Sequence, residues 1–207
     1  WSDMFFHLVF GGYYTDGVID QELLDMVPED VILTYWDYYS TDKDKYDRQI
    51  KKHLAFKNKI AFAGGAWKWS GIVPSIDHSM NVTKLALEAC RENGIDMVFT
   101  TAWGDNGAEA SIMTILPVLA LFAEISYSDA DVDQKVSDKL KALTGYDTAD
   151  FMTLCSLNRT TQTEPIVPHN NPAKYLFFQD PLMGLFDYHV LSSFPAHYAA
   201  CSKTLDA

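Results

Sequence analysis

The sequence predicts an α/β fold in which short parallel strands alternate with helices, followed by a region built from helices alone. Three observations lead to this prediction. Over the first half of the 207 residues, short runs of apolar, β-branched and aromatic residues alternate with helical patterns. Four aromatic clusters, each containing Trp, recur at nearly even spacing. After about residue 107 only helical patterns remain. This order is typical of a parallel sheet with right-handed crossover connections.

Four segments in the first half are expected to be strands. Residues 31–36 (VILTYW) form an uninterrupted apolar run, which indicates a strand buried on both faces. Residues 59–63 and 96–101 are shorter runs of the same kind, and residues 1–10 have the pattern of a buried strand that ends in a loop. Helical spacing of apolar residues falls between these runs, at 19–27, 42–57 and 81–93.

The second half is expected to be helical, apart from one loop rich in Thr, Pro and Asn at residues 160–172. Its first helical pattern is long and apolar and is interrupted by Pro117. The expected helices are 108–127, 132–143, 148–157 and 180–205.

Composition excludes several classes of function. The formal net charge is −12 and no basic stripe exists, which argues against nucleic acid and against anionic membrane surfaces as partners. No apolar run approaches the roughly 20 residues of a membrane span. Cys90, Cys155 and Cys201 are widely spaced, which predicts buried thiols in a reducing setting and favours the cytoplasm. The six histidines lack metal-ligand spacing and no nucleotide-binding motif is present, so we expect neither a metal nor a cofactor.

The aromatic clusters contain all five tryptophans. They are WSD at 1–3, YWD at 35–37, WKW at 67–69 and WGD at 103–105, about one βα unit of roughly 30 residues or more apart. Each cluster is expected at the carboxyl end of a strand, and parallel α/β proteins bind ligands beyond these ends. Aromatic faces beside carboxylates suit a sugar. The clusters therefore predict one pocket for a carbohydrate.

The third and fourth clusters contribute small residues as well as rings. Gly104 turns the chain, so that Asp105 is expected at the pocket mouth. The alternative is that Asp105 is only the N-cap of the next helix, and Glu109 an acid in its first turn. The i, i+2 pair Trp67 and Trp69 follows Gly-Gly and is expected either to line one side of the pocket or to belong to the core, with Lys68 solvated between them.

The second cluster ends a strand. Alternation places Tyr35 and Asp37 on one side and Trp36 on the other. If that first side is the interior of a barrel, the Tyr hydroxyl and the carboxylate reach a ligand while Trp36 packs outside. The alternative is a core Tyr followed by a turn Asp.

Taken together, the segments WSDMFF, LTYWDYY, FAGGAWKWSGIVPS, TTAWGDNGAEAS and NPAKYLFFQDPLMGLFDYH resemble family 20 glycoside hydrolases, the β-N-acetylhexosaminidases. The resemblance covers nearly the whole chain. It implies a (β/α)8 barrel that removes terminal β-linked N-acetylglucosamine or N-acetylgalactosamine. It also implies a retaining mechanism in which the substrate's own acetamido oxygen attacks the anomeric carbon, an exception to the two-carboxylate scheme.

The resemblance assigns roles to residues. Tyr35 matches the Tyr that hydrogen-bonds the acetamido oxygen, and Asp37 and Asp105 match acids that hold sugar hydroxyls. Many relatives have Glu at the position of Asp105. Three tryptophans match rings that line the floor of the site and its acetamido pocket: Trp1, Trp67 and Trp103.

One family motif is absent. The Asp-Glu pair, whose Glu is the general acid, follows the fourth strand in the family, and the sugar-gripping Arg lies near the first. Neither motif occurs here. The resemblance thus implies the C-terminal half of the barrel, about strands five to eight, over residues 1–127, and a helical region over 128–207.

The chain starts inside an expected strand, so we expect a fragment that is inactive alone and is completed by an N-terminal half, covalent or cleaved. A non-catalytic carbohydrate-binding protein and a different (β/α)8 glycosidase are the alternatives.

Overall fold

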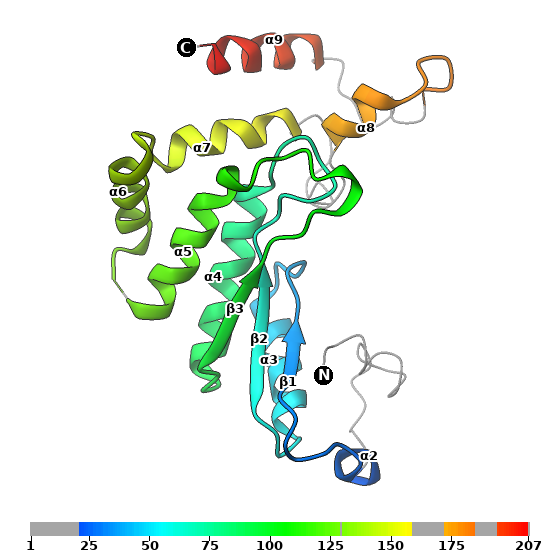
Figure 1. The fold of residues 1–207 in the computed structure, drawn as a ribbon, viewed down its shortest axis with the longest axis vertical. Helices are drawn as coiled ribbons and strands as arrows, with labels where there is room; N and C mark the ends of the chain where they lie inside the picture. Colours follow the sequence, from blue (N-terminus) through cyan, green and yellow to red (C-terminus); the bar gives the residue numbers. More distant parts are fainter. Residues whose placement is uncertain (1–20, 129, 159–171, 185–193, 207) are drawn as a thin grey trace. The chain divides into compact units, whose positions relative to one another are not determined.

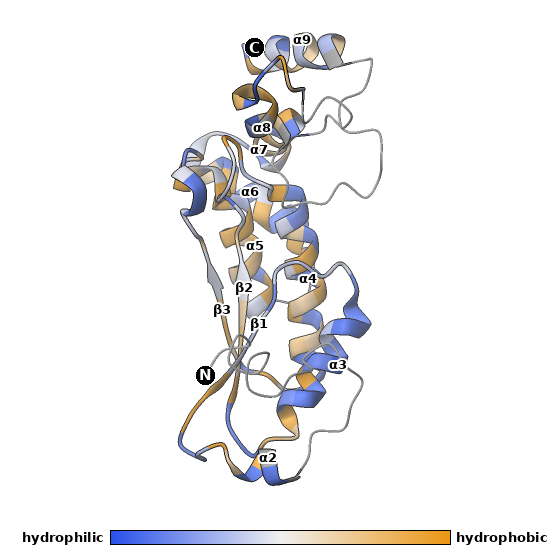
Figure 2. Cartoon of the chain, turned by 90° about the vertical axis from the view of Figure 1, so that its right-hand side faces the viewer, coloured by the Kyte–Doolittle hydropathy of each residue, from blue (hydrophilic) through white to orange (hydrophobic). Residues whose placement is uncertain are grey.

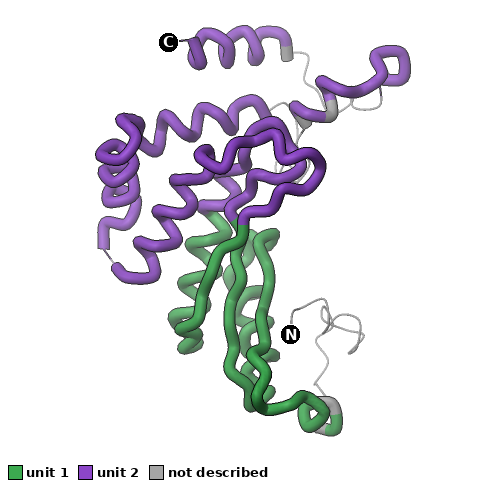
Figure 3. Tube along the Cα trace, in the orientation of Figure 1, with its two compact units in different colours: residues 1–65, 81–101 green, residues 66–80, 102–207 purple. Residues whose placement is uncertain are grey.

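The computed structural model describes residues 21–128, 130–158, 172–184 and 194–206. The chain divides into two compact units (Figure 3). The first takes in the residues up to 65 together with residues 81–101. The second takes in residues 66–80 and the residues from 102 onwards.

The first unit is built on a parallel sheet of three strands in the order β1-β2-β3, preceded by the short helix α2 (Gln21–Asp25) (Figure 1). The strands are β1 (Leu33–Trp36), β2 (Ile60–Gly65) and β3 (Met97–Thr101). Trp36 is the register partner of Ala63, and Gly65 of Thr101, so the carboxyl ends of all three strands lie at one edge of the sheet. This confirms the predicted α/β class with a parallel sheet. Within the described residues the sheet is open, and it does not close into a barrel.

Two helices follow strands of this sheet. Helix α3 (Lys43–Leu54) begins where the side chain of Asp42 accepts a hydrogen bond from the Asp44 amide at 3.0 Å. Basic residues fill its last turn, as the helix dipole favours. Helix α4 (Ile76–Glu92) begins five residues before the predicted start at residue 81. Its end is followed by Gly94, whose φ of +71° needs a residue without a Cβ.

Helix α3 packs on one face of the sheet. The Tyr35 ring lies 6.1 Å from the ring of Tyr46 and 5.3 Å from that of His53, and both of these residues belong to α3. Trp36 points to the opposite face of the sheet. Trp36 pairs with Ala63 and Ala63 with Phe99, so the exposed Phe99 lies on the same face as Trp36. Strand β1 is half-buried on that second face, so the prediction of burial on both faces was wrong.

The second unit contains three 3-10 turns and five helices among its described residues. Pro117 lies in the first turn of α5, where its missing N–H costs nothing, so this Pro begins a helix and does not interrupt one as predicted. Colouring by hydropathy shows α5 as largely hydrophobic, whereas much of α3 in the first unit is hydrophilic (Figure 2). Helix α6 ends at Gly145, with φ +85°. In chain order the elements are η1 (Asp105–Gly107), η2 (Ile112–Ile115), α5 (Leu116–Tyr127), α6 (Val132–Thr144), α7 (Thr148–Cys155), η3 (Ser156–Asn158), α8 (Pro172–Phe178) and α9 (Phe194–Leu205).

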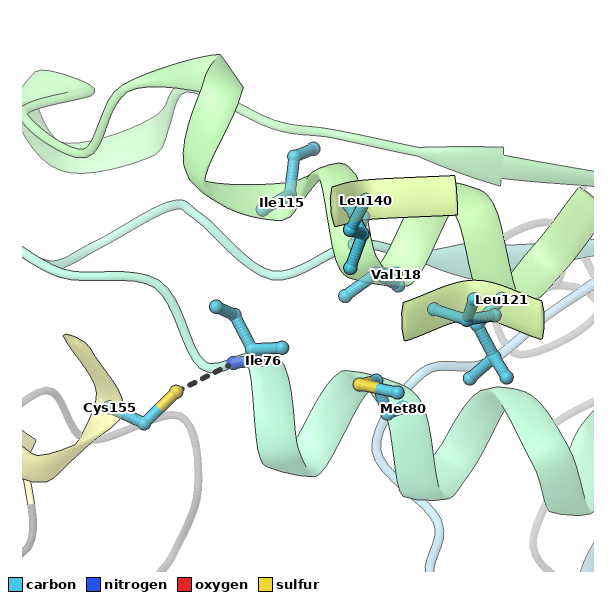
Figure 4. Packing of buried hydrophobic residues seen from close by; sticks show 9 residues of the cluster. Ile76, Met80, Ile115, Val118, Leu121, Leu140 and Cys155 are labelled. Carbon is cyan, nitrogen blue, oxygen red and sulfur yellow. Dashed lines mark hydrogen bonds between the residues drawn. The ribbon is translucent and has the colours of Figure 1, made fainter. Parts of the chain in front are cut away.

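The core of the second unit joins α5, α6 and α7 to the start of α4 (Figure 4). Cys155, at the end of α7, accepts a hydrogen bond from the Ile76 amide at 3.3 Å. A capping box formed by Asp147 and Asp150 begins α7. The buried members of this core are Ala66, Ile76, Met80, Ile115, Val118, Leu121, Val136, Leu140 and Cys155.

The tail differs from its prediction. Residues 180–205 were expected to be one helical stretch, but α9 covers only Phe194–Leu205, and residues 181–183 form a turn. Residues 185–193 lie outside the described residues. The predicted division at residue 127 is not tested by these elements and stays a prediction.

Candidate functional site

Tyr35 and Asp37 form a buried pair in the first unit. The Tyr35 hydroxyl donates to Oδ2 of Asp37 at 3.1 Å, so both side chains point to the same side, as alternation predicted. The Tyr35 side chain is 0 % exposed, and Asp37 is also buried. The carboxylate is therefore in contact with the phenol in this structure.

Asp37 also organises the connection between β1 and α3. Its Oδ1 accepts from the amides of Tyr39 at 2.8 Å and Ser40 at 3.2 Å, and Lys45 lies 3.4 Å from Oδ2. This is an Asx-type turn, in which a carboxylate replaces a backbone acceptor. Burial and the charge of Asp37 both raise the pKa of the neighbouring Tyr46, which keeps that phenol neutral.

The side that Tyr35 occupies is the one covered by α3. We expected Tyr35 and Asp37 on an inner face, with Trp36 packed outside. In the structure the Tyr35 ring contacts α3, and Trp36 points away from this helix. Alternation fixes which residues share a side, but the packing of Tyr46 and His53 decides which side the helix covers.

Trp67 and Trp69 form a stacked pair in the second unit. Their ring centroids are 4.3 Å apart and their planes differ by 18°. Both rings are buried, the Trp67 indole donates to the Trp69 carbonyl at 3.1 Å, and the Trp67 amide donates to the Ser79 hydroxyl at 2.9 Å. The pair makes a rigid segment directly after β2.

Two hydrogen bonds join this segment to the cluster after β3. The ammonium of Lys68 donates to the Trp103 carbonyl at 3.3 Å, and the Ser70 amide donates to the Asp105 carbonyl at 3.0 Å. Lys68 is 8 % exposed, so the expectation of a solvated side chain was wrong. Trp103 remains 36 % exposed, and Asp105 is exposed as well. Trp103 and Asp105 thus both keep part of their surface open to solvent on this loop.

Asp105 does not cap a helix. The N-cap position of η1 is Gly104, and that of η2 is Ser111, whose hydroxyl accepts from the Met113 amide. Glu109 lies outside the helices and forms an ion pair with Lys174, with Nζ and Oε1 2.6 Å apart. The structural alternatives for Asp105 and Glu109 are therefore wrong.

Trp1 lies outside the described residues. Among the residues that the structure does describe, no group of three or more His, Cys, Asp or Glu side chains is arranged to hold a metal ion. None of the described helices is both long and apolar enough to cross a membrane. Cys90, Cys155 and Cys201 are free and buried, as predicted.

Residues 149–207 match the family described as Glycoside Hydrolase 20C C-terminal domain. This region is related to the family 20 hexosaminidases. The match does not extend to Tyr35, Trp67 or Trp103. No curated protein matches the chain.

Within the family 20-related region, α7, η3 and α9 contact each other through polar groups. The His197 ring nitrogen Nε2 lies 2.8 Å from the Ser156 carbonyl oxygen, and the Tyr198 hydroxyl donates to the Leu157 carbonyl at 2.8 Å. Burial raises the pKa of Tyr198 to about 12, with a further contribution from Cys201. These contacts are structural, since they attach α9 to the end of α7.

The family 20-related region also supplies Lys174, on α8, which contacts the loop after Trp103. Sequence reasoning missed both this lysine and the burial of Lys68. The only available signal was position: Lys68 lies between two tryptophans, and Lys174 lies in the segment NPAKYLFF that carried part of the family resemblance.

Proposed function

We propose that this chain is part of a retaining, substrate-assisted exo-β-N-acetylhexosaminidase, which removes terminal β-linked N-acetylglucosamine or N-acetylgalactosamine. The observation that carries the proposal is the match of residues 149–207 to the family 20C C-terminal domain. It is supported by the position of the YWD, WKW and WGD clusters, each of which begins within two residues of the end of a strand in one parallel sheet. That is where parallel α/β enzymes bind their substrates.

The accessible groups of the second unit are proposed to contact the sugar first. Trp103, which is 36 % exposed, is proposed to stack against a pyranose, and the exposed Asp105 to accept from its hydroxyls. Trp67 and Trp69 are proposed to form the wall of the site. Because their rings are stacked and buried, they would support the loop and present little of their own surface.

Tyr35 is proposed to hold the acetamido oxygen and Asp37 a sugar hydroxyl. The Tyr35 hydroxyl has a single proton, which it now donates to Asp37. Binding would therefore require it to exchange the carboxylate for the acetamide. That exchange would position the acetamido oxygen for attack on the anomeric carbon, and it would leave Oδ2 of Asp37 able to accept from the substrate. Trp1 is proposed to add a further ring.

The general acid is proposed to come from residues outside these 207, because the sequence contains no Asp-Glu pair. We propose that those residues also complete a (β/α)8 barrel, of which β1, β2 and β3 are part. The open sheet is consistent with this, since β1 and β3 are its edge strands within the described residues and Phe99 is exposed on the face away from α3.

The test uses the longer protein and aryl β-N-acetylglucosaminide and galactosaminide substrates. We expect release of the β-anomer and competitive inhibition by a thiazoline mimic of the cyclised acetamide. Trp103→Ala and Asp105→Ala should each lower kcat/KM by about tenfold or more, that is, by about 1.4 kcal/mol or more of transition-state stabilisation. Binding of N-acetylglucosamine without turnover would favour a carbohydrate-binding protein. Turnover without thiazoline inhibition would favour another glycosidase mechanism.

A further inference from the structure

The loop after Trp103 has a backbone conformation that its own sequence does not favour. Three successive residues have positive φ: Asn106 at +61°, Gly107 at +107° and Ala108 at +53°. Gly adopts this region readily and Asn is tolerated in it, whereas Ala seldom adopts it, so Ala108 is the unfavourable member of the run. Such a run persists when the surrounding structure holds it, and it often marks a functional loop.

Lys174 makes two contacts that restrain this loop. Its ammonium lies 2.6 Å from Oε1 of Glu109 and also donates to the Asn106 carbonyl, so one charged group binds the loop on both sides of Gly107. The Lys174 side chain is 14 % exposed and that of Glu109 35 %, so the lysine is mostly covered while the carboxylate is partly open to solvent. Because Lys174 is 65 residues from Glu109 in sequence, the contact is a tertiary restraint and not a property of the loop alone.

Gly107 fits the ion pair closely. A Cβ at this position would lie 2.6 Å from Oε1 of Glu109, so the carboxylate occupies the space that a side chain would need. Hydrogen bonding by Lys174 lowers the pKa of Glu109, which keeps this carboxylate ionised. The glycine, the acid and the lysine therefore act as one unit.

We propose that Lys174 is a positioning residue for substrate binding: from α8 of the family 20-related region, it fixes the loop from Trp103 to Glu109 and so sets the placement of the Trp103 ring and the Asp105 carboxylate. The proposal rests on the proposed function, in which these two groups contact the sugar. Asp105 immediately precedes Asn106, and the Asn106 carbonyl belongs to the peptide between Asn106 and Gly107, so holding this carbonyl restrains the backbone next to Asp105. Small displacements of binding groups have large effects on binding and rate.

The experiment compares Lys174→Met with Lys139→Met in the longer protein. Lys139 forms an ion pair of the same 2.6 Å length with Glu124, in the same unit but on α6 and α5, so it is a matched control. Hydrogen–deuterium exchange of the amides of residues 104–109 reports on the loop without any need for activity. We expect about tenfold faster exchange in Lys174→Met and no change in Lys139→Met.

The kinetic arm separates positioning from general stability. We expect Lys174→Met to raise KM by about tenfold with kcat changed less than about threefold, and Lys174→Arg to restore much of the loss because it keeps the charge. Unchanged loop exchange overturns the proposal, as does a KM no different from that of Lys139→Met. If Trp103→Ala and Asp105→Ala leave activity intact, the proposed function fails. If both impair activity while Lys174→Met does not, only the positioning role fails.

Discussion

Replacing Asp37 by Ala tests the best-connected acid of the candidate site. In the structure its carboxylate accepts buried hydrogen bonds from the Tyr35 hydroxyl and the Ser40 amide, at 3.1 and 3.2 Å. It also accepts from the amide of Tyr39 at 2.8 Å and lies 3.4 Å from the ammonium of Lys45. Hydrogen bonds to a charged group contribute about 1.5–3 kcal/mol each, so loss of the two buried ones should cost ~3–6 kcal/mol. The partly exposed lysine adds little.

Thermal unfolding of the protein measures this cost. For a domain of this size, about 1 kcal/mol shifts the midpoint by ~2–4 °C, so Asp37→Ala should lower it by ~6–24 °C. Asp42→Ala is the matched control, because Asp42 is an exposed N-cap whose loss should cost about 1 kcal/mol. A midpoint for Asp37→Ala no lower than that of Asp42→Ala would refute the reasoning from the hydrogen-bond network.

Asp37→Asn separates the structural role of this residue from its proposed binding role. The amide retains an oxygen for the Tyr39 and Ser40 amides, and its NH2 group donates to the Tyr35 oxygen, so the fold should lose only about 1–2 kcal/mol. The charged acceptor for a sugar hydroxyl is gone, and kcat/KM should fall by about tenfold or more. A folded Asp37→Asn protein with wild-type kcat/KM would show that the residue is structural alone.

Three further outcomes are expected. Burial raises the pKa of Cys90 to about 12, so iodoacetamide at pH 8 should label this thiol only after unfolding, and rapid labelling of the native protein would contradict its burial. Leu121→Ala in the core of the second unit should cost about 2–5 kcal/mol in denaturant unfolding, whereas Leu143→Ala on the exposed surface should cost about 0.5 kcal/mol or less. The pKa of Glu109 is lowered in the folded state, so its ion pair stabilises fully above the ordinary Glu pKa of about 4.3 and is lost as pH falls through the lowered value. The stability difference between wild type and Glu109→Gln should therefore shrink from pH 6 to pH 3, and a constant difference would show that the ionised carboxylate is not what stabilises the loop.

The strands were predictable because each is a contiguous apolar run, which can be recognised in the sequence without knowledge of tertiary contacts. Residues 31–36 and 96–101 contain β1 and β3, whereas β2 begins within residues 59–63 and extends to Gly65. The parallel arrangement of the strands followed from the helices between them. Helix ends were less predictable. Pro117 was taken for an interruption because a Pro in an apolar helical pattern has two meanings, and only the backbone before it shows which applies.

Which face of the sheet a strand residue points to was harder to predict. Because side chains alternate along a strand, Tyr35 and Asp37 were expected on the same side, and the hydrogen bond between them confirms it. It did not tell us that this side meets α3, because that depends on Tyr46 and His53, which lie 11 and 18 residues further along the chain. The same limit applied to Lys68, whose burial is a tertiary property.

The loop from Trp103 to Glu109 shows why the candidate site is only partly readable from local sequence. Its composition, with two glycines, an Asn and two acids, predicted a turn with an exposed carboxylate, and Asp105 is exposed. Its conformation depends on distant groups: Lys68 holds the Trp103 carbonyl across 35 residues, and Lys174 holds the Asn106 carbonyl across 68. Positive φ at Asn106 and Ala108 is unfavourable for the isolated segment, so the loop needs these restraints to keep one conformation. A site placed by restraints of this range changes when either lysine is changed, although neither lysine was itself predicted to be a site residue.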